Sequence, residues 1–320
     1  ERHLRSGNEH SHQIDVDCFA GDGTVFSLVV FSFTLKGWGF PPSLFVFQEI
    51  DLLKFGIHDF INAQPLRDAL KTMGDWTKIE IHTNTPAHLA DQLNRGELDL
   101  AMIPSIEYLK NSDRLRLLPG VSIASKNQVG TVLLVSKFPL ETIDTLAIDN
   151  RSRTSVALLK LLFKNEMSPD LKWVDCEPNP EIMLKDHDAA LIIGDPALGF
   201  KKEGSTVYDL SEEWYQRTGK TFVHAVIAVK EGVEIDERIV EIFRVAKQEG
   251  LMKIASTVRN QSRLTNFPEP LLLDYLKNKI RYNLGGEELD GLSHFQSLCK
   301  SAGLIEKKTP FEFAFDEGAI

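Results

Sequence analysis

The sequence has little cysteine, and its cysteines lack the spacing that metal sites or disulfide frameworks use. Cys18, Cys176 and Cys299 lie far apart in the 320 residues, and no CxxC pair occurs. Three isolated cysteines support neither a zinc ribbon nor a disulfide scaffold. A chain without disulfides suits a reducing compartment, so we predict a cytoplasmic location.

Positive charge is also scarce. The chain has 36 lysines and arginines against 46 acidic residues, which gives a net charge of −10 at pH 7. Proteins that bind nucleic acid or anionic membranes draw their affinity from clustered lysine and arginine. We therefore predict no nucleic-acid partner and no stable membrane association. An apolar share of 42% and a charged share of 26% are ordinary for a folded chain, and the length suggests about two domains.

The apolar run near the N-terminus is too short to cross a membrane. Residues 24–35, TVFSLVVFSFTL, make up 12 positions, whereas a spanning helix needs about 20 apolar residues. A secretory signal has basic residues before its apolar run, but here Asp15, Asp17 and Asp22 precede it. We interpret residues 1–51 as an N-terminal extension of unknown role, more readily a disordered or poorly packed tail than an anchor.

Common catalytic and cofactor motifs are missing. The sequence has no HExxH and no GxSxG, and the GKT at 219–221 lacks the earlier glycine of a phosphate-binding loop, where Trp214 stands instead. The Gly-Trp-Gly at 37–39 lacks the third glycine of a dinucleotide fingerprint. Only His10 and His12 have the spacing of metal ligands. We predict no metal site and no cofactor.

From Leu53 onward, short apolar strands alternate with helices, which is typical of the α/β class. One α/β unit is followed by a second, and helical patterns fill the last part of the chain. The predicted strands are 54–58, 78–83, 98–103, 120–125, 130–136, 145–149, 171–175, 189–194 and 222–229, and the predicted C-terminal helices are 235–249, 250–258, 269–283 and 286–302.

Two long predicted strands, 130–136 and 222–229, bracket the second unit. The simplest geometry is two lobes, with the second inserted into the first and these strands as crossovers. We predict lobe 1 from 52–132 and 226–307, lobe 2 from 133–225, and a C-terminal tail at 308–320. Proteins built in this way bind a small ligand in the cleft between the lobes and close on it by a hinge motion.

The most polar strand-to-helix turn spans residues 149–155, DNRSRTS. Ligands of open α/β sheets bind at the carboxyl ends of strands, and helix N-termini attract carboxylates and phosphates. This turn therefore predicts an anion site formed by Ser152, Arg153, Thr154 and Ser155. Arg153 can hold a carboxylate with two hydrogen bonds, or it can pair with Asp149 instead. An ordinary N-cap explains one hydroxyl here but does not require four such residues.

Three other turns carry weaker candidates. Asn62 follows a predicted strand, where its amide can donate and accept, although an asparagine often satisfies its own turn. Ser105 and Asp195 are good N-caps, and Gly194 allows close approach to the backbone, which a tight turn also needs. His224 lies in an apolar run, where we expect a hydrogen-bonded core histidine.

Six segments of the chain resemble chorismate dehydratases and occur in the order found in that family. The family catalyses the first committed step of the futalosine route to menaquinone, and the similarity covers about Leu53 to Lys307. The segments are INAQPL, LNRGELDLAMIPSIEYL, GTVLLVSKFPLETIDTLAIDNRSRTSVALLKLL, LIIGDPAL, EEWYQRTGKTFVHAV and YNLGGEELDGL.

The resemblance implies the two-lobed, type II fold of periplasmic solute-binding proteins, with a hinged interlobe cleft, used for catalysis in the cytoplasm. It implies elimination of water from chorismate, which gives 3-[(1-carboxyvinyl)oxy]benzoate without a cofactor. Where the family usually has Tyr-Leu-Asn, this chain has Phe60-Ile61-Asn62, and the N-terminal extension has no counterpart in the family.

With this resemblance, Asn62 and Ser105 become candidate catalytic residues. Our hypothesis is that Asn62 orients the leaving hydroxyl or the enolpyruvyl group, with Ser105 as a neighbouring donor. The turn at 152–155, together with Gly194 and Asp195, would bind the substrate. No catalytic base stands out in these turns, and the substrate's own enolpyruvyl carboxylate is a candidate for that role.

Two alternatives stay open at this point. The sister enzyme of the same pathway, which makes dihydroxynaphthoate, shares the fold but has different sequence motifs. A non-catalytic solute-binding protein that delivers a small carboxylate to a transporter is the second alternative. It requires an exported chain, of which the apolar run at 24–35 is the only hint.

Overall fold

The computed structural model describes residues 12–19, 25–32, 52–149, 151, 153–201 and 203–315. The chain divides into two compact units, residues 1–52 and 53–320. In the first unit, β1 (His12–Phe19) and β2 (Val25–Ser32) pair antiparallel, with His12 opposite Ser32. A regular strand pair therefore occurs within the extension that we interpreted as a disordered or poorly packed tail.

The first sheet of the second unit has six strands in the order β13-β6-β12-β5-β3-β4. Its strands β4, β3 and β5 run parallel, whereas β12 is antiparallel to both β5 and β6. The strands are β3 (Leu53–Ile57), β4 (Ile79–Thr83), β5 (Leu100–Pro104), β6 (Leu115–Ser125), β12 (Phe222–Lys230) and β13 (Ile280–Arg281).

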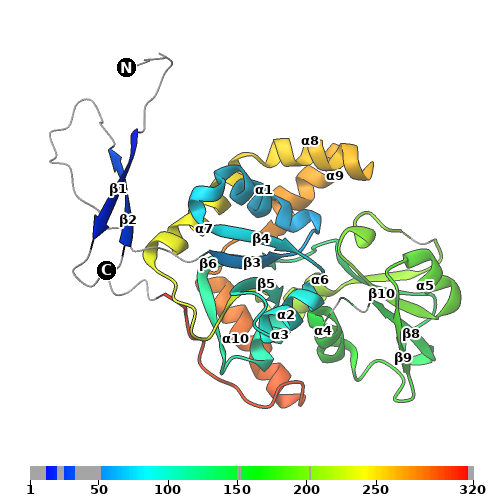
Figure 1. Cartoon of the computed structure of the whole chain (residues 1–320). Helices are drawn as coiled ribbons and strands as arrows, with labels where there is room; N and C mark the ends of the chain where they lie inside the picture. The colour runs from blue at the N-terminus through cyan, green and yellow to red at the C-terminus, as the bar shows by residue number, and fades with distance from the viewer. Residues whose placement is uncertain are drawn as a thin grey trace. The chain divides into compact units, whose positions relative to one another are not determined.

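The second sheet has five strands in the order β11-β7-β10-β8-β9. Here β10, β8 and β9 run parallel, and β7 is antiparallel to β10 and β11. The strands are β7 (Val132–Ser136), β8 (Thr145–Asp149), β9 (Lys172–Cys176), β10 (Ala189–Ile193) and β11 (Thr206–Asp209). Figure 1 shows the two sheets side by side, each with its own helices.

The chain enters the second sheet between β6 and β7 and returns to the first sheet at β12. The predicted lobe boundaries at 132/133 and 225/226 each fall inside a strand, β7 and β12 respectively. Because a strand belongs to the sheet with which it pairs, we propose boundaries immediately before Val132 and Phe222 instead.

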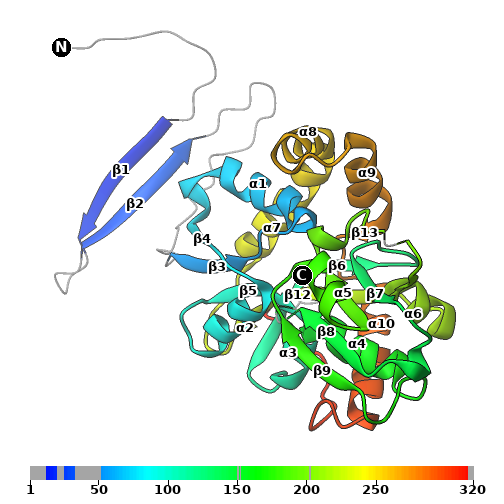
Figure 2. The same ribbon diagram turned by 90° about the vertical axis from the view of Figure 1, so that its right-hand side faces the viewer.

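Helices cover both faces of the first sheet, with α1 and α7 on one face and α2, α3 and α10 on the other (Figures 1 and 2). A strand that is covered on both faces has an almost continuous apolar sequence, as β12 has. The helices are α1 (Gln64–Met73), α2 (Pro86–Asn94), α3 (Ser105–Lys110), α4 (Arg153–Phe163), α5 (Pro180–Asp186), α6 (Leu210–Thr218), α7 (Glu237–Met252), α8 (Ile254–Thr265), α9 (Glu269–Asp274) and α10 (Gly286–Ser301).

The prediction of one helix over residues 269–283 holds as far as Lys279 and is wrong from Ile280 onward. Helix α9 ends at Asp274, a single π-helical turn follows at Tyr275–Lys279, and Ile280–Arg281 then form β13. Ile280 lies opposite Ser125 of β6, so pairing at the edge of the sheet outweighs the local helical pattern.

Two helices approach neighbouring backbone at glycines. A Cβ added to Gly250 of α7 would lie 2.3 Å from the carbonyl oxygen of Pro65, and one added to Gly291 of α10 would lie 1.9 Å from the carbonyl oxygen of Thr221. Any larger residue would force these segments apart. Helix α7 is therefore packed directly on the start of α1, and α10 on the residue before β12. Among the helices that the structure describes, none is both long and apolar enough to cross a bilayer.

Candidate functional site

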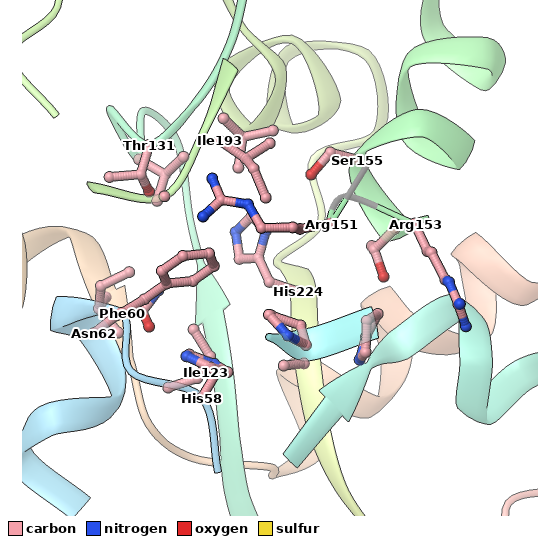
Figure 3. Close-up of a pocket in the computed structure, with 18 residues that line it drawn as sticks. His58, Phe60, Asn62, Ile123, Thr131, Arg151, Arg153, Ser155, Ile193 and His224 are labelled. Atoms are coloured by element: carbon pink, nitrogen blue, oxygen red, sulfur yellow. The ribbon is translucent and has the colours of Figure 1, made fainter. Parts of the chain in front are cut away.

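A cavity lies where strand ends of the first sheet face strand ends of the second, and its empty volume is about 590 Å³ with the part open to solvent included. Carboxyl ends of strands are where open α/β sheets bind ligands. Segments that follow β3, β8 and β10 contribute to the wall together with the last residue of β5 (Figure 3). The lining includes His58, Phe60, Asn62, Pro104, Thr131, Arg151, Arg153, Thr154, Ser155, Gly194 and His224.

Asn62 lies in the short 3-10 turn η1 (Ile61–Ala63) that joins β3 to α1. Its Nδ2 donates to the hydroxyl of Tyr275 at 3.1 Å, and that hydroxyl lies 3.1 Å from Oγ1 of Thr131. Its Oδ1 is buried and has no hydrogen-bond partner among the described residues. An unpaired buried acceptor costs about 1–3 kcal/mol, and the protein encloses this oxygen although the residue itself lines the cavity.

Arg153 lines the cavity, but its guanidinium points away from it (Figure 3). Nη1 and Nη2 donate to the two carboxylate oxygens of Asp91 on α2, each at 2.8 Å. Nη1 also donates to Glu107 on α3 at 3.2 Å. The structure therefore shows the charged end of Arg153 engaged with two carboxylates of the first lobe.

Arg151, which was not among the predicted site residues, places its guanidinium in the cavity (Figure 3). The guanidinium lies 5.3 Å from the centre of the Phe60 ring. Its Nε and Nη2 donate to Asp149, at 2.9 and 2.6 Å, and Asp149 is almost fully buried. Nη1 has no hydrogen-bond partner within the described part of the chain, so it is available to an anion in the cavity.

The hydroxyl groups of the predicted site residues lie at different depths. Thr154 and Ser155 line the cavity. Ser105 is completely buried behind the lining, where its Oγ donates to the carbonyl of Val223 at 2.7 Å and lies 3.5 Å from Oγ1 of Thr154. Ser105 can therefore reach the cavity only through Thr154. Ser152 lies outside the described residues.

Gly194 and Asp195 follow β10 and contact the turn that carries Asn62. Gly194 has a φ of +65°, and a Cβ there would lie 3.1 Å from two atoms of the Phe60 ring. Asp195 accepts the backbone N–H of Ile61, with distances of 3.1 and 3.3 Å to its two oxygens. Burial is the main cause that raises the pKa of Asp195 to about 6, and the nearby Asp59 carboxylate also raises it.

Two histidines that line the cavity are uncharged at neutral pH. Burial lowers the pKa of His224 to about 4. Burial, with a smaller contribution from the charge of Arg67, lowers the pKa of His58 to about 3. The predicted hydrogen bond of His224 is confirmed, because its Nε2 lies 2.8 Å from Oγ of Ser125, but the predicted core position is wrong, because the residue lines the cavity. Its place on the cavity wall, and that of His58, were not predicted.

The arrangement combines one guanidinium with several neutral polar groups, which suits a small anionic ligand. Among the residues that the structure describes, no group of three or more histidine, cysteine, aspartate or glutamate side chains is placed to hold a metal ion. The absence of a cofactor stays a prediction.

Solved structures with this architecture identify the fold. A protein from Archaeoglobus fulgidus superposes with a TM-score of 0.64 at 18% identity, covering 79% of this chain and 98% of its own. The periplasmic aliphatic sulphonate binding protein SsuA of Escherichia coli gives 0.55 at 15% identity, with 82% and 96% covered. A Candida albicans gene product described as having the generic periplasmic binding protein fold gives 0.54 at 13% identity, with 81% and 92% covered. The predicted two-lobed fold class is confirmed.

Sequence comparison gives the family within that fold. Residues 53–301 match the family described as menaquinone biosynthesis. The chorismate dehydratase of Thermus thermophilus is 32% identical over 257 residues, which cover 75% of this chain and 92% of that enzyme. The chain belongs to the menaquinone biosynthesis family, which confirms the resemblance seen in the sequence.

Proposed function

We propose that this protein is a chorismate dehydratase, a hydro-lyase that converts chorismate to 3-[(1-carboxyvinyl)oxy]benzoate in menaquinone biosynthesis. The observation that carries the proposal is the 32% identity to a chorismate dehydratase over 92% of that enzyme's length. The cavity adds independent support, since it offers a guanidinium and neutral hydrogen-bonding groups to a small dicarboxylate.

Arg151 and the start of α4 bind the carboxylates of chorismate in this proposal. Nη1 of Arg151 faces the cavity, while Asp149 holds the other side of the guanidinium. Charge-assisted hydrogen bonds from arginine to carboxylate are among the strongest in proteins. Thr154 and Ser155 lie in the first turn of α4, where the helix dipole also favours an anion. We thus assign to Arg151 the carboxylate contact first predicted for Arg153, and we keep Ser152 as a candidate.

The reaction breaks the C3–H bond and the C4–O bond of chorismate, and the proton and hydroxide together form water. Because the product ring is aromatic, the enzyme's main tasks are to position the substrate and to help the hydroxyl leave. Asn62 orients the leaving hydroxyl or the enolpyruvyl group through its side-chain amide, which Tyr275 holds at one N–H. Ser105 acts as a positioning residue through Thr154. The substrate's enolpyruvyl carboxylate serves as the base.

Incubation of the purified chain with chorismate tests the proposal. We expect the ultraviolet absorbance of an aromatic product to appear, with mass spectrometry showing the loss of one water. Chorismate that binds without a spectral change would point to a solute-binding protein. Turnover of a cyclic futalosine compound in place of chorismate would point to the sister dihydroxynaphthoate synthase.

We also propose that the enzyme is located in the cytoplasm. Its partner is a small-molecule substrate, and we expect no nucleic-acid partner and no stable membrane association. The net charge of −10 supports the last two points. Fractionation of cells that produce the full chain tests the location, and recovery of the protein with membranes would contradict it.

A further inference from the structure

Strand β12 contains a β-bulge at His224. Val223 lies opposite Ala124, and Ala225 lies opposite Ile123, so β12 advances two residues while β6 advances one. Consecutive residues of a regular strand point to opposite faces of the sheet. At this bulge, however, both His224 and Ala225 line the cavity. Bulges frequently re-aim a side chain next to an active site, and this one directs the imidazole into the cleft (Figure 3).

The surroundings of the ring determine which nitrogen carries its proton. Nε2 of His224 lies 2.8 Å from Oγ of Ser125 and 3.3 Å from Oγ of Ser211. The single hydroxyl proton of Ser125 is donated to Ser211 at 2.9 Å. We assign the Ser125 proton to this bond, which leaves the oxygen of Ser125 to accept from the imidazole and places the ring proton on Nε2. In the neutral ring, Nδ1 is then left with a lone pair.

Nδ1 of His224 is the atom that faces the ligand. It has no hydrogen-bond partner among the described residues, and the protein does not enclose it, so it opens onto the cavity that the residue lines. Because burial holds the pKa of His224 near 4, the ring stays neutral at pH 7 and Nδ1 acts as an acceptor.

We propose that Nδ1 of His224 accepts a hydrogen bond from a hydroxyl group of the substrate. A lone pair repels a carboxylate but pairs with an O–H donor, so this position complements the donors Arg151, Thr154 and Ser155 rather than repeating them. The inference rests on the proposed function, in which chorismate carries one alcohol hydroxyl and the dehydrated product carries none. His224 therefore helps to distinguish the substrate from the product, and Ser125 is a positioning residue that fixes the tautomer.

Steady-state kinetics of His224→Phe test this role. Phenylalanine keeps an aromatic ring in the bulge and removes both nitrogens. Loss of one hydrogen bond predicts a KM for chorismate about five- to tenfold higher, because a typical net contribution is about 1 kcal/mol. A bond that the bound substrate and the transition state make equally contributes to binding alone, so kcat should stay within about twofold. The inhibition constant of the product should also stay within about twofold, since the product lacks the hydroxyl.

Equal weakening of substrate and product, or an unchanged KM, would overturn the proposal. A second measurement uses the wild-type chain and does not depend on the folding of a variant. Nitrogen-15 NMR should show His224 with a protonated Nε2 and an unprotonated Nδ1, and chorismate should shift Nδ1 more than the product does. A protonated Nδ1 in the free protein would also overturn the proposal. If the wild-type chain does not turn over chorismate, the proposed function is wrong. The NMR measurement of the tautomer is independent of turnover and still shows whether Nδ1 of His224 is an acceptor.

Discussion

The carboxylate of Asp195 accepts the backbone N–H of Ile61, with distances of 3.1 and 3.3 Å, and so joins the turn after β10 to the turn before α1. These two turns belong to strands of different sheets. Ile61 directly precedes Asn62, so the bond also holds the backbone of the candidate catalytic turn against the second lobe.

Asp195→Asn should change how stability depends on pH. Burial raises the pKa of Asp195 from 3.8 to about 6, so the folded state binds this proton more tightly than the unfolded state. The contribution of this group to stability is therefore full below about pH 4 and is lost as the pH rises through about 6. Asparagine keeps an acceptor for Ile61 but does not titrate. The free energy of unfolding of the wild type, relative to the variant, should fall by up to about 3 kcal/mol between about pH 4 and 7.

Urea unfolding of both proteins at the two pH values gives this difference directly. Other titrating groups, such as His58 and His224, are present in both proteins, so their contributions cancel in the comparison. An identical pH dependence in the two proteins would show that the Asp195 carboxyl is not perturbed in the folded state.

Arg151→Gln and Arg153→Gln should differ in their effect on substrate binding. The Arg151 variant loses the charged donor in the cavity, and we expect a KM for chorismate about 10- to 100-fold higher. It also leaves the buried Asp149 carboxylate without its ion-pair partner, so we expect a stability loss of about 3–5 kcal/mol as well. The Arg153 variant loses the ion pairs with Asp91 and Glu107, and we expect a stability loss of roughly 1–2 kcal/mol with little change in KM.

Kinetics and urea unfolding of the two variants form the matched test. Arg151→Lys is the control for charge alone, because lysine keeps the positive charge but cannot hold Asp149 and a ligand carboxylate in the same geometry. If KM rises more in the Arg153 variant than in the Arg151 variant, then Arg153 and not Arg151 makes the contact with the substrate carboxylate.

Gly194→Ala should disturb the site as well as the backbone. Its φ of +65° and the Phe60 ring at 3.1 Å both oppose a side chain, whereas Gly204 has a φ of +75° with nothing within 4 Å of an added Cβ. Gly204→Ala is thus the control for backbone strain alone, which is worth roughly 1–2 kcal/mol. We expect Gly194→Ala to lose more stability than this and to raise KM, because Phe60 packs against Arg151. If both variants lose the same stability and Gly194→Ala keeps the KM of the wild type, then the Phe60 ring moves aside without cost.

Asn62→Asp should abolish most of the activity while keeping the shape of the side chain. An anionic carboxylate beside a dianionic substrate is unfavourable, and it lacks the N–H groups of the amide. We expect kcat/KM to fall at least about 100-fold, as happens when a well-placed active-site donor is removed. Tyr275→Phe is the control, since it removes only the hydroxyl that accepts from Asn62, and its effect should be smaller. Full turnover by Asn62→Asp would contradict the orienting role.

Much of the fold follows from local patterns in the sequence. The apolar run at 222–229 predicts β12, and Thr85 caps α2 as its position before Pro86 suggests. Strand β13 could not be predicted, because two residues after a helical pattern carry no strand signal of their own. They become a strand only because β6 offers a free edge at Ser125.

The candidate site was predictable to the level of turns but not of side-chain directions. Asn62, Thr154 and Gly194 line one cavity because strand ends converge there. The choice between Arg151 and Arg153 depends on which carboxylates the folded chain brings near each guanidinium, and Asp91 is 62 residues away from Arg153. The β-bulge turns the side chain of His224 toward the cavity, and the alternation of residues along the strand does not predict a bulge.

The contact between Gly250 and the carbonyl of Pro65 limits how this enzyme can vary. Pro65 lies three positions after Asn62, so a larger residue at 250 would displace the turn that carries Asn62. Position 250 touches no part of the cavity, yet in a survey of related chains it should tolerate as little change as the residues around the substrate. A random mutagenesis screen for lost activity should therefore recover substitutions on α7, remote from the chemistry.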